Sequence, residues 1–285
     1  MKREDVKNAL IEMCKRAVIK LPKDVVDSLE KAYEDETSKV AKMQLKAILD
    51  NIKLAEKSKK PMCQDTGVLI FYVDFGKEII ENMDSLIREA VLEATKTIPL
   101  RPNAVHPMTR KNPGNNVGVR MPHINYDFTK NEYTQIAVMP KGAGSENMSS
   151  LKMINPVEGL KGIKNFILDT VVNASGKPCP PIICGIGIGG SADIALKLAK
   201  RSLLRPLTER NSEREIARLE EELLEILNQT GIGPMGLGGK NGVLGVNIEY
   251  AFCHTASLPC AVNIQCWAAR KSVGRFYEEG RIEIF

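Results

Sequence analysis

The sequence is poor in several features that would assign a function at once. Aromatic residues make up 5% of the 285 residues, with a single Trp, which disfavours a protein that stacks nucleic-acid bases on aromatic rings. The 40 Lys and Arg residues against 35 Asp and Glu residues leave a net charge of +5, too small to indicate a nucleic-acid partner. No uninterrupted apolar stretch of about 18 residues occurs, so the sequence predicts no contact with a membrane.

Cysteine spacing excludes the common local metal and redox motifs. The 7 Cys residues include no C-x-x-C pair, which zinc fingers, thioredoxin-like motifs and ferredoxin-type runs use. The N-terminal stretch MKREDVKNALIEMCKRAVIK is charged every few positions and lacks the apolar core of a signal peptide. We therefore expect a cytoplasmic protein with reduced thiols, in which a metal site would have to gather cysteines from distant segments.

The apolar pattern predicts a mixed α/β fold with a helical N-terminal layer. A period near 3.6 residues predicts helices over 3–20, 22–33 and 38–57, so residues 1–60 are expected to be helical. Further helices are expected at 77–96, 156–174, 191–204 and 212–228. Strands are expected at 67–75, 118–126, 133–139, 181–186, 243–250 and 259–264. Because no linker or repeat interrupts the chain, we expect one domain over 1–285, with a mixed sheet and flanking helices over 61–285.

A proline-rich stretch separates two of the predicted elements. Residues 99–122 contain Pro99, Pro102, Pro107, Pro113 and Pro122 together with several Asn and Gly residues, which predicts an irregular loop. Irregular loops of about twenty residues inside a compact domain are more often functional than accidental.

Two glycine-rich segments resemble phosphate-binding loops only in part. Gly185 to Gly190 satisfies G-x-G-x-x-G between a predicted strand and a predicted helix, as a turn that could bring backbone N–H groups to an anion. However, no second apolar strand ending in an acidic residue follows about 20 residues later, which disfavours a dinucleotide site. The second segment, GIGPMGLGGKNG, fails the P-loop pattern because Pro234 replaces its first glycine and Asn241 replaces its Ser or Thr.

Sequence context divides the cysteines but does not select a ligand set. Cys63 lies in PMCQDTG before a predicted strand, Cys179 lies among prolines ahead of the glycine segment, and Cys266 follows a predicted strand. The other cysteines lie in apolar helix or strand contexts and are expected to be buried packing residues: Cys14, Cys184, Cys253 and Cys260.

At these residues the sequence resembles the alpha subunit, or N-terminal catalytic half, of the iron–sulfur class I fumarate hydratases, a family that includes the L-tartrate dehydratase alpha subunit. The resembling segments lie in the family's order over residues 61–266. They are PMCQDTG, LRPNAVHPMTRKNPGNN, KGAGSENMS, PCPPIICGIGIGG, LLRPL, GIGPMGLGGKNGVL and HTASLPCAVNIQC.

The resemblance implies a [4Fe-4S] cluster held by Cys63, Cys179 and Cys266. Three protein ligands for four irons leave one iron open, and an open iron can bind substrate oxygens as a Lewis acid. The resemblance also implies a separate beta subunit in a hetero-oligomer, because the family's partner domain supplies further arginines, a lysine and a threonine to the site.

The resemblance further implies the substrate contacts. Gln64, Asp65, Arg101 and the backbone N–H of Gly144 match the family's substrate-binding positions, and Asp65 and His254 are candidates for handling a proton or orienting the leaving water. On the residues alone, three structural alternatives remain open. Asp65 could form an Asx turn, Arg101 a surface ion pair, and His254 could be a hydrogen-bonded core residue.

The implied activity is the reversible hydration of fumarate to (S)-malate, with tartrate dehydration as the alternative. The sequence departs from the family at Pro113 and Asn115, in a loop near the substrate, which leaves the substrate open. Outside this class, a dinucleotide-binding oxidoreductase built on Gly185 to Gly190 and a redox sensor with a fully ligated cluster remain as alternatives.

Overall fold

The computed structural model describes residues 2–285, and the chain divides into two compact units that are each assembled from separated segments. Unit 1 comprises the residues up to Pro22, Ile52–Gly142 and Arg270–Phe285. Unit 2 comprises Lys23–Asn51 and Ala143–Ala269. The mixed α/β class is confirmed, because each unit combines helices with a sheet of its own. One catalytic domain over 1–285 stays a prediction.

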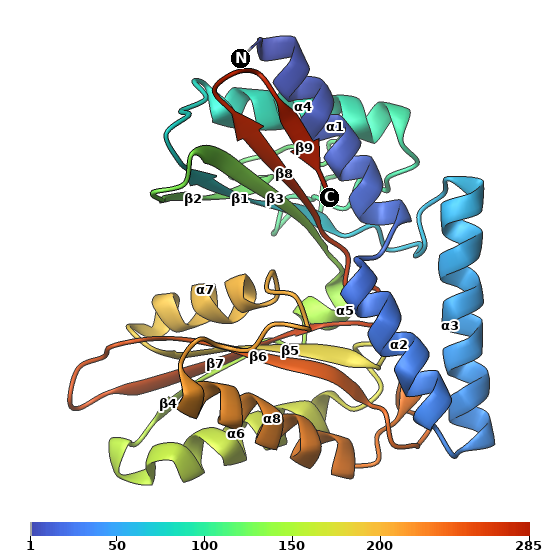
Figure 1. The fold of residues 1–285 in the computed structure, drawn as a ribbon, viewed down its shortest axis with the longest axis vertical. Coiled ribbons are helices and arrows are strands. Elements are labelled where there is room, and N and C mark those ends of the chain that lie inside the picture. Colours follow the sequence, from blue (N-terminus) through green and yellow to red (C-terminus); the bar gives the residue numbers. More distant parts are fainter. Residues whose placement is uncertain (1) are drawn as a thin grey trace. The chain divides into compact units, whose positions relative to one another are not determined.

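Unit 1 contains a five-stranded sheet in the order β2-β1-β3-β8-β9. Its strands are β1 (Val68–Phe75), β2 (His123–Phe128), β3 (Tyr133–Lys141), β8 (Ser272–Tyr277) and β9 (Ile282–Ile284). β1 and β2 are parallel, and the other neighbouring pairs are antiparallel. The C-terminal hairpin of β8 and β9, drawn in red in Figure 1, was not expected from the sequence.

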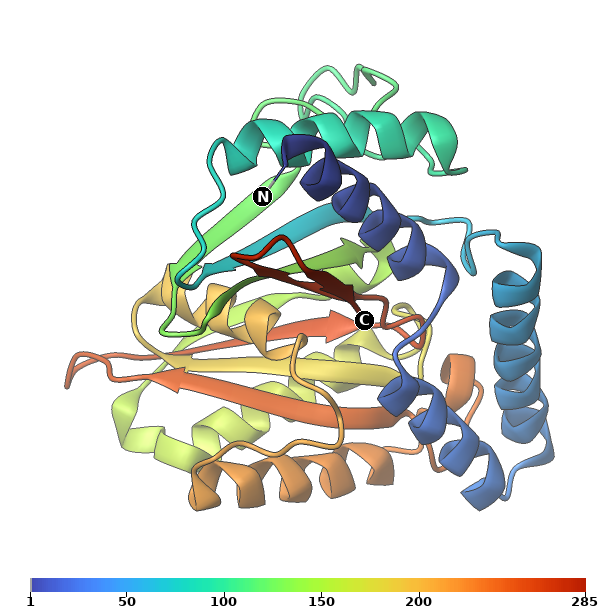
Figure 2. The same ribbon diagram turned by 45° about the horizontal axis from the view of Figure 1, so that its top comes forward.

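Two helices cover one face of the unit 1 sheet, α1 (Arg3–Ile19) and α4 (Met83–Thr97), and they contact each other (Figure 2). Their apolar stripes meet the inward side chains of β1, β3 and β8 in one core, which includes Leu10, Phe71 and Ile87. The predicted helix over 77–96 therefore exists but begins later, at Met83, because residues 77–82 precede the periodic apolar positions.

Unit 2 contains a four-stranded sheet in the order β4-β7-β5-β6. Its strands are β4 (Ser150–Ile154), β5 (Ile182–Gly189), β6 (Val243–Ala251) and β7 (Leu258–Gln265). β5 and β6 are parallel, whereas β7 is antiparallel to both β5 and β4. β4 was not expected, and its largely exposed residues explain the weak apolar signal.

Helices lie on both faces of the unit 2 sheet, as Figure 1 shows. One face carries α6 (Gly159–Ala174) and α8 (Arg214–Gln229), whose apolar residues join the main core. The other face carries α7 (Ala192–Ser202), which meets the sheet through small side chains, Ala195 and Ala199 against Ala261. The short helix α5 (Ala143–Glu146) begins the second segment of this unit.

The first glycine-rich segment has a different role from the one expected. β5 continues to Gly189, so Gly185 and Gly187 lie inside the strand, and the turn expected from Gly185 to Gly190 is limited to its end, where Gly189 and Gly190 have positive φ values. A Cβ atom on Gly185 would lie 2.1 Å from the carbonyl oxygen of Ala199, and one on Gly187 would lie 2.0 Å from that of Ala195. The two glycines therefore let α7 approach the sheet closely, since alternate residues of a strand face the same side.

The helices predicted within residues 1–60 are confirmed and are shared between the units. α2 (Lys23–Asp35) contacts β6 in unit 2, whereas α3 (Lys39–Ser58) has residues in both units. Between them lies Glu36, a residue only 4% exposed, whose carboxylate accepts hydrogen bonds from the backbone N–H groups of Lys240 and Asn241. Glu36 thereby fixes the second glycine-rich segment.

Within the described part of the chain, none of the helices combines the length and the apolar composition needed to cross a bilayer.

Candidate functional site

The eight candidate residues fall into two groups, one in each unit. Cys63, Gln64, Asp65 and Arg101 belong to unit 1. Gly144, Cys179, His254 and Cys266 belong to unit 2.

In unit 1, Asp65 lies in the loop between α3 and β1, where it forms an Asx turn. Its Oδ1 accepts hydrogen bonds from the backbone N–H of Gly67 at 2.9 Å and from Nδ2 of Asn103 at 3.4 Å. Gly67 has a φ of +74°, and a Cβ there would lie 2.7 Å from the backbone nitrogen of Lys141. The Asx turn that the sequence allowed for Asp65 is therefore present, and it fixes the position of Oδ1. It does not determine where Oδ2 points. Its neighbours Cys63, half-buried, and Gln64, exposed, share this loop.

Side-chain amides connect the irregular loop of residues 98–122 to the Asp65 loop. The backbone N–H of Arg101 donates to Oγ1 of Thr66 at 3.0 Å, which sets Arg101 beside the Asp65 loop with its side chain exposed. Asn116, only 5% exposed, accepts from the N–H of Asn103 at 2.7 Å and donates to the carbonyl oxygen of Arg101 at 3.0 Å. Sequence reasoning missed Thr66, Asn103 and Asn116; the clustered Asn residues of the loop were the available signal.

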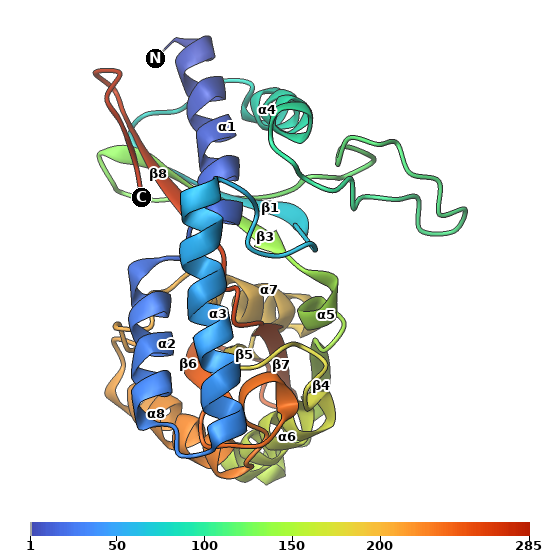
Figure 3. The same ribbon diagram turned by 90° about the vertical axis from the view of Figure 1, so that its right-hand side faces the viewer.

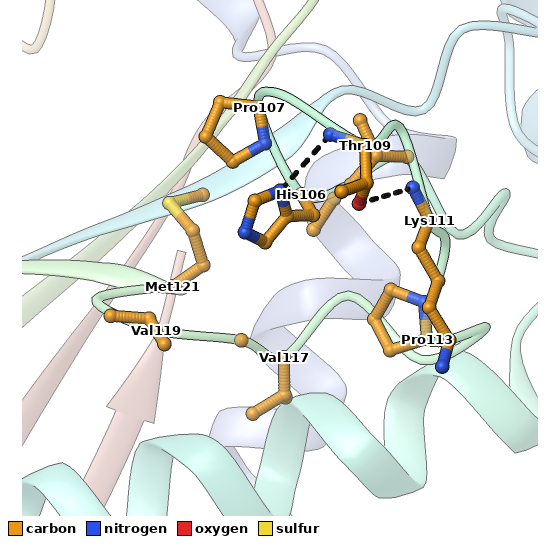
Figure 4. A pocket seen from close by; sticks show the side chains of 11 residues that line it. His106, Pro107, Thr109, Lys111, Pro113, Val117, Val119 and Met121 are labelled. Carbon is orange, nitrogen blue, oxygen red and sulfur yellow. Dashed lines mark hydrogen bonds between the residues drawn. The ribbon is translucent and has the colours of Figure 1, made fainter.

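The same loop encloses a cavity of about 280 Å³. In Figure 4, Val117, Val119 and Met121 line one side of it and His106 and Lys111 the other. Nδ1 of His106 accepts a hydrogen bond from the backbone N–H of Thr109 at 3.2 Å, so it helps to shape the loop. The lining is mainly apolar and has few cationic side chains to bind a small dicarboxylate. We therefore do not assign this cavity to the candidate site. Figure 3 shows how far the loop extends beyond α4.

In unit 2, Cys179 and Cys266 are brought together by the backbone. The N–H of Trp267 donates to the carbonyl oxygen of Cys179 at 3.3 Å, which couples the residue after Cys266 to Cys179. Gly144 joins them, because a Cβ there would lie 3.4 Å from the carbonyl oxygen of Lys177, two residues before Cys179. Cys179 is exposed and Cys266 half-buried, and both lie outside regular elements.

His254 lies away from this pair. It is an exposed residue of the loop between β6 and β7, and its Nδ1 accepts a hydrogen bond from the N–H of Ala256 at 3.0 Å. Cys266 comes directly after the opposite end of β7, an eight-residue strand. At about 3.4 Å per residue, the strand spans roughly 24 Å from its first to its last residue, and the two residues lie beyond its opposite ends. The strand predicted at 259–264, between His254 and Cys266, could have indicated this separation from the sequence alone. His254 is not the core histidine of the structural alternative.

Accessibility separates most of the cysteines into two classes. Burial raises the pKa of Cys14, Cys184 and Cys260 to about 12, because a buried thiolate loses its hydration. These three are packing residues, as expected. Cys253 was expected to be buried as well, and this is wrong: it is exposed, beyond the end of β6 in the loop that holds His254.

The three cysteines proposed as ligands have suitable chemistry for an iron–sulfur cluster. Cys63, Cys179 and Cys266 are at least partly accessible and lie in loops, and cysteine sulfurs are the usual ligands of such clusters. Among residues 2–285, no three His, Cys, Asp or Glu side chains gather closely enough to hold a single metal ion. By residue type and accessibility, the three cysteines fit the group.

Comparison with known proteins gives one family and consistent relatives. The family model described as fumarate hydratase (Fumerase) matches residues 7–275, a range that includes all eight candidate residues. A protein of Methanocaldococcus jannaschii, provisionally named L(+)-tartrate dehydratase subunit alpha, is 51% identical over 283 residues, which cover 97% of this chain and 99% of that protein. The L(+)-tartrate dehydratase subunit alpha of Escherichia coli strain K12 is 36% identical over 255 residues, which cover 88% of this chain and 84% of that protein.

Proposed function

The chain belongs to the fumarate hydratase (Fumerase) family, and on that premise we propose that it is the alpha subunit of a hydro-lyase acting on a 2-hydroxy dicarboxylate. The observation that carries this proposal is the near full-length similarity to proteins named as tartrate dehydratase alpha subunits. We place L(+)-tartrate first as the substrate, whereas the sequence motifs alone had placed fumarate first. Hydration of fumarate to (S)-malate is the second candidate.

Both reactions make the same demands on the protein. Dehydration of tartrate breaks one C–H bond and one C–O bond, releases water and leaves an enol that becomes a 2-oxo dicarboxylate. Hydration of fumarate forms the corresponding two bonds across the C=C bond. In each case a carbon-bound proton must be moved, hydroxide must be stabilised as it leaves or arrives, and two carboxylates must be held.

The proposed cofactor is a [4Fe-4S] cluster held by Cys63, Cys179 and Cys266. When bound through three cysteines, such a cluster supplies an open iron that acts as a Lewis acid on the substrate's oxygens. The support from this chain is the accessibility of these thiols and the backbone connection between Cys179 and Trp267. The buried cysteines Cys14 and Cys184 lack that accessibility.

The remaining candidate residues bind and orient the substrate. The exposed guanidinium of Arg101 offers a planar pair of donors that matches a carboxylate. Asp65, held through Oδ1 by its turn, is the proposed acceptor of the carbon-bound proton or the group that orients water. Gln64 and the backbone N–H of Gly144 are the proposed further contacts.

His254 keeps its proposed role only if two copies of the chain share a site, because β7 separates it from Cys266 of its own chain. A complementation experiment tests this arrangement. His254→Ala and Cys266→Ala chains are each expected to be inactive in the loaded complex. Coexpressed, they should recover about a quarter of wild-type activity, since half of the sites in mixed dimers would be intact. No recovery would remove His254 from the site.

The relatives are named as alpha subunits, which supports a separate beta subunit as partner. We expect the cluster-loaded alpha chain alone to have little activity, because the resemblance assigns further cationic groups to the partner. Full turnover by the alpha chain alone would contradict this.

The decisive experiment is anaerobic reconstitution with iron, sulfide and the beta subunit, followed by assays with L(+)-tartrate and fumarate. Cys63→Ala, Cys179→Ala and Cys266→Ala should each lower turnover at least about 100-fold. Cys253→Ala is the matched control, an exposed cysteine outside the proposed set. Equal loss in all four variants would contradict the ligand assignment.

The alternatives from other classes have less support. A dinucleotide site on Gly185 to Gly190 is disfavoured because Gly185 and Gly187 face α7 inside β5. A redox sensor would need a fully ligated cluster, whose paramagnetic resonance spectrum would not change on adding substrate; a change supports an open iron.

A further inference from the structure

Arg270 stands out among the charged residues of unit 1. It lies two residues before β8, and only 2% of the residue is exposed. Its Nε and Nη1 atoms are buried and have no hydrogen-bond partner among residues 2–285. Burying two guanidinium nitrogens without hydrogen-bond partners is costly, so a charge retained at such a place points to a task beyond packing.

Gly142 connects Arg270 to Asp65. A Cβ on Gly142 would lie 3.1 Å from Oδ2 of Asp65 and 3.7 Å from Nη2 of Arg270, so the carboxylate and the guanidinium flank the same point. The sheet register agrees with this arrangement. β3 pairs with β8 from Val138 opposite Ser272, and continuing that pairing sets Arg270 on the same face as Gly142. Only glycine leaves this space open.

The two oxygens of Asp65 have different surroundings. Oδ1 accepts the turn hydrogen bond from Gly67 and the longer one from Asn103. Oδ2 is the atom that faces Gly142 and the guanidinium of Arg270. The Asx turn therefore explains the position of Oδ1, and Oδ2 lies on the side of Gly142 that the guanidinium of Arg270 also flanks.

We propose that Arg270 is the positioning residue of Asp65: across the space above Gly142, its buried positive charge attracts Oδ2 and holds the carboxylate in its working orientation. This inference rests on the proposed function, in which Asp65 contacts the substrate. Arg270 itself does not touch the substrate. Replacing Arg270 should therefore displace the Asp65 carboxylate. A displaced catalytic group lowers the rate of the chemical step more than it weakens substrate binding.

A double-mutant cycle tests the pair in the full chain without cluster or partner. Arg270→Gln, Asp65→Asn and the double variant are unfolded by denaturant, and the effects on the unfolding equilibrium constant are compared. Because the two groups attract each other, the double variant should differ about tenfold from the product of the single effects. Additive effects would overturn the proposal. The double-mutant cycle measures unfolding only, so its result does not depend on whether the proposed activity is correct.

Steady-state kinetics of the cluster-loaded complex test the consequence for catalysis. Arg270→Gln should lower kcat by about 30-fold or more while KM changes less than about threefold, and Arg270→Lys should recover at least about tenfold because it restores the charge. Arg275→Gln is the matched control in the same unit. Arg275 also has an Nε without a hydrogen-bond partner among the described residues, and its guanidinium lies 5.0 Å from the Tyr133 ring.

The outcomes are distinguishable. If Arg270→Gln and Arg275→Gln have equal effects on kcat, or if Arg270→Lys gives no recovery, Arg270 is structural and the proposal fails. If the wild-type complex acts on neither tartrate nor fumarate, the proposed function fails, and the double-mutant cycle alone decides whether Arg270 and Asp65 are coupled.

Discussion

In unit 1 the candidate residues lie in irregular loops that side-chain amides hold together, whereas in unit 2 the candidate cysteines lie next to strand ends that a backbone hydrogen bond connects. Asn103 and Asn116 carry the connections around Asp65 and Arg101. In unit 2, the N–H of Trp267 reaches the carbonyl oxygen of Cys179, and close packing of α7 on β5 supports the sheet that both flank. The two units thus prepare their residues by different physical means.

Because of this difference, a substitution can change the site geometry without changing the stability of the sheet in unit 1, but not in unit 2. Side-chain hydrogen bonds can be removed one at a time, so a substitution in the unit 1 loops should alter the site while the sheet persists. A site at strand ends depends on the sheet itself, so in unit 2 the geometry should be lost together with the packing that supports it.

The largest expected effect comes from Gly187→Ala in unit 2. The added Cβ would lie 2.0 Å from the carbonyl oxygen of Ala195, so α7 must move away from β5. We expect a loss of about 3 kcal/mol in the free energy of unfolding and reduced iron retention. Denaturant unfolding and iron analysis measure both. Gly118→Ala in unit 1 is the control, since nothing lies within 4 Å of its Cβ position. Equal losses in Gly187→Ala and Gly118→Ala would contradict the view that the site of unit 2 depends on the packing of its sheet more than the site of unit 1 does.

The next effect comes from Asn116→Ala in unit 1. The variant loses the hydrogen bond from the N–H of Asn103 and the one to the carbonyl oxygen of Arg101, and it leaves two partly buried backbone groups without these partners. We expect about 2 kcal/mol of destabilisation, confined to the loop, together with a raised KM because Arg101 is released. Hydrogen exchange should show faster exchange in residues 98–122 and unchanged exchange in β3. Faster exchange throughout unit 1 would contradict a locally held site.

Glu36 in unit 2 sharpens the comparison, because here a side chain also holds a loop. Burial alone would raise the pKa of Glu36, but hydrogen bonds from Ser38, Asn241, Thr37 and Lys240 hold the pKa below its ordinary value of 4.5. The ionised carboxylate therefore stabilises the fold above about pH 4.5, and this stabilisation is lost as the pH falls toward the lowered pKa.

Glu36→Gln should cost about 1.5 kcal/mol at pH 7, because both carboxylate oxygens accept from N–H groups and the amide nitrogen of Gln cannot. The difference from wild type should shrink below about pH 4.5, which thermal unfolding at several pH values measures. A difference that does not vary with pH would mean that the charge of Glu36 has no part in holding the loop.

The sequence predicts the strongly periodic elements and fails where the pattern is interrupted. α1, α3 and α8 lie close to their expected bounds because long apolar stripes define them. β8 was missed because Gly274 and Arg275 interrupt its apolar residues, although inward and outward positions alternate along it. Gly185 and Gly187 were interpreted as a turn, yet their spacing of two residues fits one face of a strand.

The residues proposed for the site stay a prediction, and their arrangement could not be read from the sequence. Local motifs name Cys179 and Cys266, but their proximity depends on a backbone hydrogen bond between distant segments. The separation of His254 from Cys266 depends on the length and straightness of β7. Arg270 belongs to no motif, and only its burial beside Gly142 distinguishes it from other arginines.

The smallest expected effect compares the two ends of β7. Cys253 and Cys266 are both accessible cysteines of unit 2, but Cys253 lies with His254 at the end opposite the backbone connection to Cys179. If position and not exposure decides cluster binding, Cys253→Ser should leave the iron and sulfide content per chain unchanged, whereas Cys266→Ser should reduce it severalfold. A reduced iron and sulfide content in Cys253→Ser would mean that Cys253 is a ligand. The cluster would then lie at the end of β7 next to Cys253 and His254, and not at the end next to Cys266.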